Sequence, residues 1–356
     1  MFRWFKRPNP HTLQRLGILR MGGLGDVMNS LIMATALKQA YPHIAITYIT
    51  DTRWASLVEA LGCVDSVIAF DEDQRHAWQP WHTLIQQLRQ AKLEFLFPLQ
   101  NNLRWFLLAC TLFPWRWAKR QPHGPHSTDA FFRTLQRVFP TLTEKPCTLL
   151  PNIPTLPSPL PEACQALPQP WLLCCPIGQN DGHRQGRTWP MAYWQALIQQ
   201  WLDTSTGSVV IIGSTSEAPE HACLRTLSPQ RVHVRSGLDD IVNTARLLQE
   251  ATMIVTGDSG PLHMAAALQR PTLALMGSTR PEHCGGYSPT VQTLQQTLPA
   301  HKDNQRTEVE PPLCVGCEQK RCAFVPLGTL TPCMEGIPPQ QVWGKLKAYA
   351  TLPVSC

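Results

Sequence analysis

The segment around Asp258 carries the residue types that could bind a diphosphate. A short apolar run precedes the turn Asp258-Ser259-Gly260, and an apolar stretch, residues 262–268, predicts a short helix after it. A strand that turns sharply into a helix directs free backbone N–H groups and the positive end of the helix dipole at one point, where a diphosphate can bind. Asp258 and His263 add a carboxylate and an imidazole. The alternative is that Asp258 or Ser259 only caps the helix and that His263 is an ordinary core histidine.

A second candidate group lies near the start of the chain. Residues 16–20 predict a strand, residues 21–25 a glycine-rich turn, and residues 26–40 a helix that ends before Pro42. Asp26 places a carboxylate, a possible general base, at the start of this helix. Asp26 could equally be a helix N-cap, and the two roles are compatible.

Two arginines, Arg184 and Arg187, precede Trp189-Pro190 at the expected start of another helix. A planar guanidinium can hold two oxygens of an anionic ligand at once. Either arginine could instead be an ordinary surface residue.

These three segments resemble glycosyltransferase family 9, the family of the ADP-heptose:lipopolysaccharide heptosyltransferases. Residues 258–281, D-S-G-x-x-H-x-A-A-A-L-x-R-P-T-x-A-L-x-G-S-T-x-P, are similar to its donor-site motif. The loop that ends in Gly25-Asp26 and the basic residue before Trp189 match two further motifs, although family members often have lysine where this chain has Arg187. The resemblance implies that Asp26 is the general base. It assigns donor binding to Gly25, Arg184, Arg187, Asp258, Ser259, Gly260 and His263.

Strands and helices alternate on both sides of a proline-rich stretch, residues 151–170. Residues 16–50 read as a βαβ unit of Rossmann type, and the alternation restarts at residue 171. Proline excludes a long helix or a central strand, so the stretch predicts a linker. The expected fold class is α/β of the GT-B type, with two Rossmann-like doubly wound parallel-sheet domains facing a cleft. The expected parts are an acceptor domain (1–150), the linker (151–170), a donor domain (171–338), and a closing helix and tail (339–356).

Four cysteines in the segment 314–333 have spacings that could surround one tetrahedral metal ion. They are Cys314, Cys317, Cys322 and Cys333. Related family 9 chains have similar cysteines, and autotransporter heptosyltransferases hold iron with such a cluster. The resemblance therefore implies structural iron or zinc, while no cofactor is expected for catalysis. The alternatives are buried free thiols or a disulfide.

Basic and aromatic residues occur together in two places, residues 2–7 and residues 104–120. Both clusters suit an anionic membrane surface or an anionic glycolipid acceptor. The alternatives are a frayed tail and a solvated helix edge. A nucleic-acid partner is not expected, because a pI of 8.7 is only mildly basic and no recognition motif occurs. The basic residues of the second cluster are Arg104, Arg116, Lys119 and Arg120.

No apolar run reaches the ~18–20 residues that span a bilayer. The first ten residues lack the apolar core of a signal peptide. We therefore expect a cytoplasmic protein that associates peripherally with the inner face of the cytoplasmic membrane.

The expected function is that of an inverting glycosyltransferase, which transfers heptose from ADP-heptose to the inner core of lipopolysaccharide. One alternative keeps the chemistry but uses another nucleotide-sugar, or a protein acceptor as in autotransporter heptosyltransferases. A second alternative is a non-catalytic nucleotide-sugar-binding protein. The presence of both Asp26 and Asp258 argues against this second alternative.

Overall fold

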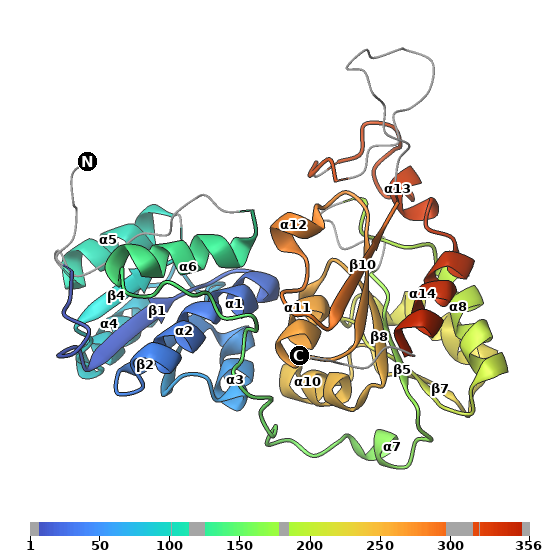
Figure 1. Ribbon diagram of the computed structural model, residues 1–356, viewed down its shortest axis with the longest axis horizontal. Helices are drawn as coiled ribbons and strands as arrows, with labels where there is room; N and C mark the ends of the chain where they lie inside the picture. The colour runs from blue at the N-terminus through green and yellow to red at the C-terminus, as the bar shows by residue number, and fades with distance from the viewer. Residues whose placement is uncertain are drawn as a thin grey trace. The chain divides into compact units, whose positions relative to one another are not determined.

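The computed structural model describes residues 7–100, 102–113, 125–177, 185–296, 316–319 and 321–350 of the 356. The chain divides into two compact units, Met1–Pro157 and Ser158–Cys356. Each unit contains one parallel sheet with helices packed against it (Figure 1).

Unit 1 is built on a four-stranded parallel sheet with the strand order β3-β2-β1-β4. Its central strands are apolar and almost wholly buried, as expected where helices cover both faces of a parallel sheet. The chain runs outward from β1 to β3 and then returns to β4, so the strand order reverses between β1 and β4. The strands are β1 (Arg15–Leu19), β2 (Ala45–Asp51), β3 (Ser66–Phe70) and β4 (Phe95–Pro98).

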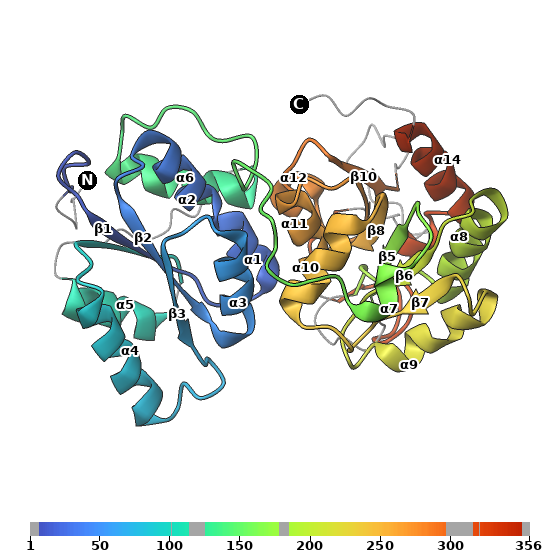
Figure 2. The ribbon, with the colours of Figure 1, turned by 90° about the horizontal axis from the view of Figure 1, so that it is seen from below.

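The helices of unit 1 form two groups. α1, α2 and α6 pack against one another. α4 and α5 lie side by side (Figure 2), and a core that includes Phe70, Leu84 and Trp105 joins them to the sheet. Because the chain reverses its direction across the sheet after β3, right-handed connections place α4 on the face opposite α1. The helices are α1 (Leu24–Ser30), α2 (Ile32–Ala40), α3 (Thr52–Leu61), α4 (Trp78–Gln90), α5 (Leu103–Leu112) and α6 (Ser127–Val138).

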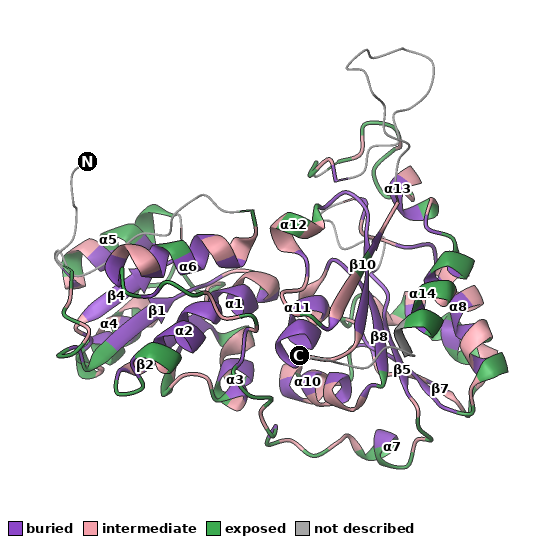
Figure 3. Ribbon diagram, in the orientation of Figure 1, coloured by how far each residue is buried: buried purple, intermediate pink, exposed green. Residues whose placement is uncertain are grey.

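Unit 2 contains a six-stranded parallel sheet with the order β10-β9-β8-β5-β6-β7. This is the doubly wound Rossmann order, and its reversal lies between β5 and β8. The central strands are buried throughout (Figure 3). The strands are β5 (Leu172–Cys175), β6 (Val209–Ile211), β7 (Val232–Val234), β8 (Met253–Gly257), β9 (Thr272–Met276) and β10 (Val291–Gln295).

The helices of unit 2 include two that pack together far apart in sequence, α8 and α14. Both contribute to one hydrophobic core cluster of this unit, with Trp194 from α8 and Val342 from α14. The helices are α7 (Glu162–Gln165), α8 (Met191–Thr204), α9 (Ala218–His221), the 3₁₀ helix η1 (Ala222–Leu227), α10 (Ile241–Glu250), α11 (Gly260–Ala267), α12 (Pro281–Cys284), α13 (Pro332–Glu335) and α14 (Pro339–Ala350).

The expected α/β class with two doubly wound parallel sheets is confirmed. The expected single helix over residues 26–40 is wrong, because the chain forms α1 and α2 with a break at Leu31. The hydroxyl of Ser30 donates to the carbonyl of Val27 at 2.8 Å and contacts the hydroxyl of Tyr48 at 2.6 Å. A serine that bonds back to the preceding turn competes with the regular helix pattern, and here the helix is interrupted directly after it.

The division between the units, at Pro157 and Ser158, falls within the proline-rich stretch. That stretch contains only the single turn α7, which agrees with the exclusion of a long helix by proline. The domain boundaries drawn from the sequence remain a prediction.

Candidate active site

A guanidinium and a carboxylate meet at the carboxyl edge of the sheet in unit 2. Arg187 lies in the loop after β5, and Asp258 lies in the turn after β8, so each follows a strand that flanks the reversal. An Nη atom of Arg187 lies 2.8 Å from Oδ2 of Asp258, and their side chains are 26% and 6% exposed. Open α/β sheets bind ligands at this position. The structure thus brings together two of the residues that the sequence assigned to donor binding.

Arg187 retains capacity for a further anionic partner. Its Nε atom is buried and has no hydrogen-bond partner within the described part of the chain. A guanidinium carries five N–H donors and no acceptor, so one contact with Asp258 leaves most of them available. A phosphate oxygen at this edge could therefore be bound without first breaking the ion pair.

The turn into α11 offers fewer backbone donors than the sequence suggests. Ser259 is the N-cap residue, but its side chain does not cap the helix and instead contacts the hydroxyl of Thr256 at 3.1 Å. Pro261 has no N–H, and the N–H of Leu262 already bonds to the Ser259 carbonyl at 3.2 Å. The dipole of α11 still favours an anion at this position. With fewer backbone N–H groups available, the guanidinium charge of Arg187 is the main feature that could bind the anion.

Gly257 allows the two loops to approach closely. A Cβ atom at this position would lie 2.6 Å from Cδ1 of Ile177 and 3.1 Å from the carbonyl oxygen of Arg187. A larger residue would therefore push the Arg187 loop away from the β8 turn. Gly260, predicted to bind the donor, begins α11 directly beside this contact.

Polar residues continue along the same edge of unit 2. His263 lies on α11 and is buried. After β6, Glu217 accepts hydrogen bonds from the backbone N–H and the hydroxyl of Ser214, both at 2.7 Å. Nδ1 of the buried His221 lies 2.6 Å from the hydroxyl of Ser236. Burial lowers the pKa of His221, although the carboxylates of Glu217 and Glu220 oppose the shift. These groups lie on segments that follow β6, β7 and β8, and these parallel strands end at the same edge of the sheet as β5.

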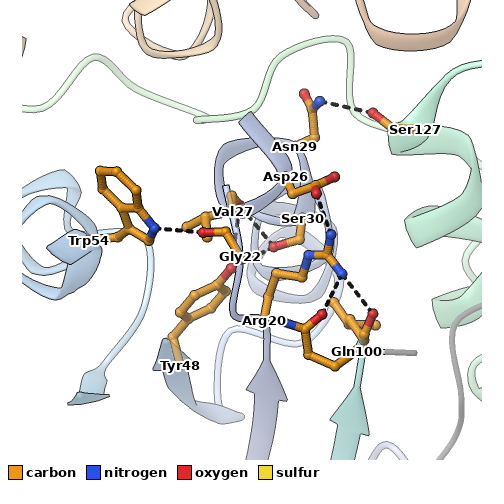
Figure 4. A network of polar contacts seen from close by, with 11 residues as sticks. Arg20, Gly22, Asp26, Val27, Asn29, Ser30, Tyr48, Trp54, Gln100 and Ser127 are labelled. Carbon is orange, nitrogen blue, oxygen red and sulfur yellow. Dashed lines mark hydrogen bonds and ion pairs between the residues drawn. The ribbon is translucent and has the colours of Figure 1, made fainter. Parts of the chain in front are cut away.

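Asp26 lies at the corresponding position of unit 1. It follows β1, which flanks the reversal in that sheet, and it belongs to the first turn of α1. The N-cap interpretation is wrong, because Gly23 is the N-cap residue and no side chain caps this helix. Asp26 is 45% exposed and forms an ion pair with Arg20, whose Nη atom lies 2.5 Å from Oδ2 (Figure 4).

Arg20 is the site residue that the sequence interpretation missed. It is only 8% exposed, and its other Nη atom donates to the carbonyl of Leu99 at 3.0 Å and to Oε1 of Gln100 at 3.1 Å. Leu99 and Gln100 follow β4, so Arg20 connects the ends of the two strands that flank the reversal. The sequence does contain a signal for Arg20, because it directly follows a run of apolar residues that predicts a buried strand. Arginine is almost never buried without a partner, so this position predicts an acidic partner nearby.

Two further contacts fix the loop around Asp26. Gly22 has a φ of +101°, which a residue with a side chain rarely adopts, and its carbonyl accepts a hydrogen bond from Nε1 of Trp54 at 2.7 Å. Asn29, one turn after Asp26, donates to the hydroxyl of Ser127 at 2.9 Å, while its buried Oδ1 has no partner among the residues described. Gly25, also assigned to donor binding, lies inside α1.

The cysteine segment lies against the Arg187 loop. The backbone N–H of Cys322 donates to the side chain of Gln185 at 2.8 Å, and Gln185 also donates to the carbonyl of Pro326 at 2.7 Å. Burial raises the pKa of the Cys333 thiol, while a hydrogen bond with Thr331 lowers it. No group of three potential ligands close enough for a metal ion occurs among the described residues, and Cys314 lies outside them. The metal site therefore remains a prediction.

Several residues predicted to act in binding lie outside the described parts of the chain. Arg104 is described and lies in the first turn of α5. Among the described residues, no helix is both long and apolar enough to cross a membrane. Those outside are Arg184, Arg116, Lys119, Arg120 and the N-terminal residues 1–6.

Comparison with known proteins points to the same family as the sequence motifs. Residues 158–314 match the model of glycosyltransferase family 9 (heptosyltransferase). The chain is 24% identical to lipopolysaccharide heptosyltransferase 1 of Pseudomonas aeruginosa, over 95% of this chain and 99% of that protein.

Two solved structures have a similar fold at low identity. A family 9 glycosyltransferase of Veillonella parvula has a TM-score of 0.72 at 16% identity, covering 95% of this chain and 97% of that one. The Escherichia coli heptosyltransferase WaaC with ADP has a TM-score of 0.67 at 17% identity, covering 94% and 99%. Both structures support the GT-B fold. The motifs, the two sheets and the match of residues 158–314 agree with one another, and together they support the resemblance of this chain to the glycosyltransferases of family 9.

Proposed function

We propose that this enzyme transfers heptose, with inversion, from ADP-heptose to the inner core of lipopolysaccharide. The observation that supports this most directly is the placement of both candidate carboxylates. Asp26 and Asp258 each follow a strand that flanks the reversal of strand order in its sheet, and each is paired with an arginine. The Pseudomonas aeruginosa relative is named as a heptosyltransferase, and the similar structure of WaaC holds ADP.

Unit 2 would bind the donor. The guanidinium of Arg187 would hold diphosphate oxygens through the donors that Asp258 leaves available. Asp258 would accept a hydrogen bond from a sugar hydroxyl, and Glu217 would accept one from the nucleoside. As the bond to the sugar breaks, negative charge grows on the diphosphate, so the contact with Arg187 strengthens in the transition state.

Asp26 would serve the acceptor. The acceptor hydroxyl oxygen attacks the anomeric carbon of heptose from the face opposite the diphosphate. The bond between that carbon and the diphosphate oxygen breaks, and its electron pair leaves with ADP. Asp26 takes the hydroxyl proton as the new bond forms, which requires a carboxylate that is ionised and accessible. Asp26 is 45% exposed and lies beside the guanidinium of Arg20, and its accessibility supports this role.

The acceptor would be an anionic glycolipid, reached peripherally at the inner face of the cytoplasmic membrane. α4 and α5 both follow parallel strands, so they begin at the same edge of the unit 1 sheet as α1. Large apolar side chains are exposed there, and Arg104 lines a groove of about 360 Å³ between the two helices. The exposed residues are Trp78 at 75%, Leu103 at 69%, Phe106 at 41% and Leu107 at 52%. Apolar side chains beside a cation suit an anionic lipid surface.

A thermal-shift panel of nucleotides and nucleotide-sugars tests the donor assignment. A ligand at ~100 times its dissociation constant adds about 2.7 kcal/mol to the free energy of unfolding. Selective stabilisation by ADP and ADP-heptose is expected. A preference for UDP or GDP species would instead indicate another donor.

A further inference from the structure

The side chain of Arg20 has the geometry of a rigid support for Asp26. It is nearly buried, and three contacts to three different residues determine its position: the ion pair with Asp26 and the two hydrogen bonds to Leu99 and Gln100. Its guanidinium carbon also lies 5.8 Å from the centre of the Phe131 ring. A planar guanidinium held on several sides cannot rotate freely, so it fixes the carboxylate oxygen that it contacts.

The two oxygens of Asp26 are therefore not equivalent. Oδ2 faces Arg20, and the side chain as a whole remains 45% exposed (Figure 4). Oδ1 is thereby left as the oxygen that can meet a hydroxyl group. The two hydrogen-bond acceptors of Arg20, Leu99 and Gln100, belong to the loop after β4. A hydrogen bond from the Leu99 N–H to the Leu19 carbonyl, at 2.9 Å, joins this loop to β1.

On this basis we propose that Arg20 is a positioning residue for the transfer reaction. It holds Oδ2 of Asp26 so that Oδ1 points at the acceptor hydroxyl. Because Gln100 in the loop after β4 binds Arg20, the position of that loop also determines the orientation of the Asp26 carboxylate. The inference rests on the proposed role of Asp26 as the base.

The ion pair also favours the return of Asp26 to its carboxylate form after each transfer. When Asp26 takes the hydroxyl proton, the nearly buried guanidinium loses its counter-charge, and an uncompensated charge in such a position is unfavourable. Loss of the proton to solvent restores the pair. Arg20 thus acts through Asp26, on the orientation and the recovery of its carboxylate.

Single-turnover transfer from ADP-heptose, with enzyme in excess, tests the proposal in a double-mutant cycle of Arg20→Met and Asp26→Asn. Arg20→Met is expected to lower the rate constant for transfer about ten- to a hundredfold, because small misplacements of a catalytic group have effects of this size. Its dissociation constant for ADP is expected to stay within about threefold of wild type. In the Asp26→Asn background the same substitution is expected to have an effect below about threefold, since coupled residues are not additive.

Two further variants separate positioning from folding. Gln100→Leu removes one support of Arg20 and is expected to lower the transfer rate a few-fold with unchanged ADP affinity, while Arg20→Lys, which keeps the charge without the planar fork, is expected to fall between wild type and Arg20→Met. Arg15→Met is the matched control, because Arg15 is an exposed residue of β1, the strand that directly precedes Arg20. If Arg20→Met does not fold, the transfer rates and ADP affinities of Gln100→Leu and Arg20→Lys test the positioning role of Arg20 instead.

Three results would overturn the inference: an unchanged rate in Arg20→Met, equal effects of Arg20→Met with and without Asp26, or wild-type rates in both Gln100→Leu and Arg20→Lys. A wild-type rate in Asp26→Asn would instead overturn the proposed function itself. Loss of activity in Asp26→Asn together with a wild-type rate in Arg20→Met would overturn only the role of Arg20.

Discussion

Arg187 and Asp258 are separated by 71 positions in the sequence, yet the guanidinium of one lies 2.8 Å from the carboxylate of the other. They meet because β5 and β8 are neighbours in the sheet and the loops that follow these strands leave from the same edge. The pair lies where the strand order reverses, which is the position at which such sheets bind nucleotides. A nucleotide bound at this edge could use the N–H donors of Arg187 that Asp258 leaves available.

We predict that Arg187→Ala weakens ADP binding about ten- to a hundredfold, because the loss of a charge-assisted contact costs ~1.5–3 kcal/mol. Isothermal titration with ADP measures the change directly. Arg246→Ala is the matched control, since Arg246 forms a comparable pair with Glu250 on α10 at 2.7 Å. Unaltered ADP affinity in Arg187→Ala would move the phosphate role away from this residue.

Asp258→Ala is predicted to weaken binding of ADP-heptose more than binding of ADP. The carboxylate is assigned to the sugar, and its removal leaves Arg187 free for the phosphates. Competition titrations with the two ligands give the two affinities. An equal loss for both would mean that Asp258 acts mainly by holding Arg187 in place.

Asp26→Asn is predicted to leave donor affinity nearly unchanged and to lower turnover by about two to four orders of magnitude, the usual range for a lost general base. The amide is nearly isosteric with the carboxylate but cannot accept the proton. Turnover and ADP affinity measured on one preparation separate the two effects. Retention of more than about a third of wild-type turnover, in an assay limited by chemistry, would contradict the role.

We predict that the free energy of unfolding of unit 2 decreases as the pH is lowered, because His221 is buried. Burial lowers its pKa in the folded state, so the unfolded chain binds the proton more readily. The stabilising contribution of neutral His221 is complete above the unfolded pKa of about 6.5 and is lost progressively as the pH falls from there toward the folded pKa. Thermal melting from pH 7.5 to 5 is expected to show a smaller decline in His221→Gln than in wild type. His82→Gln, at an exposed position of α4, is expected to follow wild type.

Binding to anionic vesicles is predicted to depend on the exposed apolar residues of α5. Replacing Leu103, Phe106 and Leu107 by serine is expected to reduce co-sedimentation, and Arg104→Ser is expected to reduce it most at low salt. Each surface cation contributes about 1 kcal/mol near an anionic leaflet, and salt screens this attraction beyond ~8–10 Å. Ile153→Ser, an exposed apolar residue elsewhere in unit 1, is the control. Equal binding of all variants would exclude α5 as the contact surface.

The sequence predicted the fold class well because both sheets are parallel and buried, and such strands produce apolar runs that alternate with helices. The break at Leu31 was not predicted, because the apolar pattern continues through it and gives no sign of the bond from the Ser30 hydroxyl to the Val27 carbonyl. The site was predicted only in part for a similar reason. Asp26, Arg187 and Asp258 stand in recognisable motifs, whereas the role of Arg20 depends on Leu99 and Gln100, which only the order of the strands brings near.

The most direct test of the proposed function is a transfer assay with purified enzyme, ADP-heptose and a lipopolysaccharide acceptor that lacks heptose, analysed by mass spectrometry of the acceptor. The account predicts the addition of one heptose to each acceptor with release of one ADP, and a rate in Asp26→Asn that is lower by about two orders of magnitude or more. An acceptor mass that stays unchanged while another nucleotide-sugar is consumed, or transfer that proceeds equally well in Asp26→Asn, would contradict it.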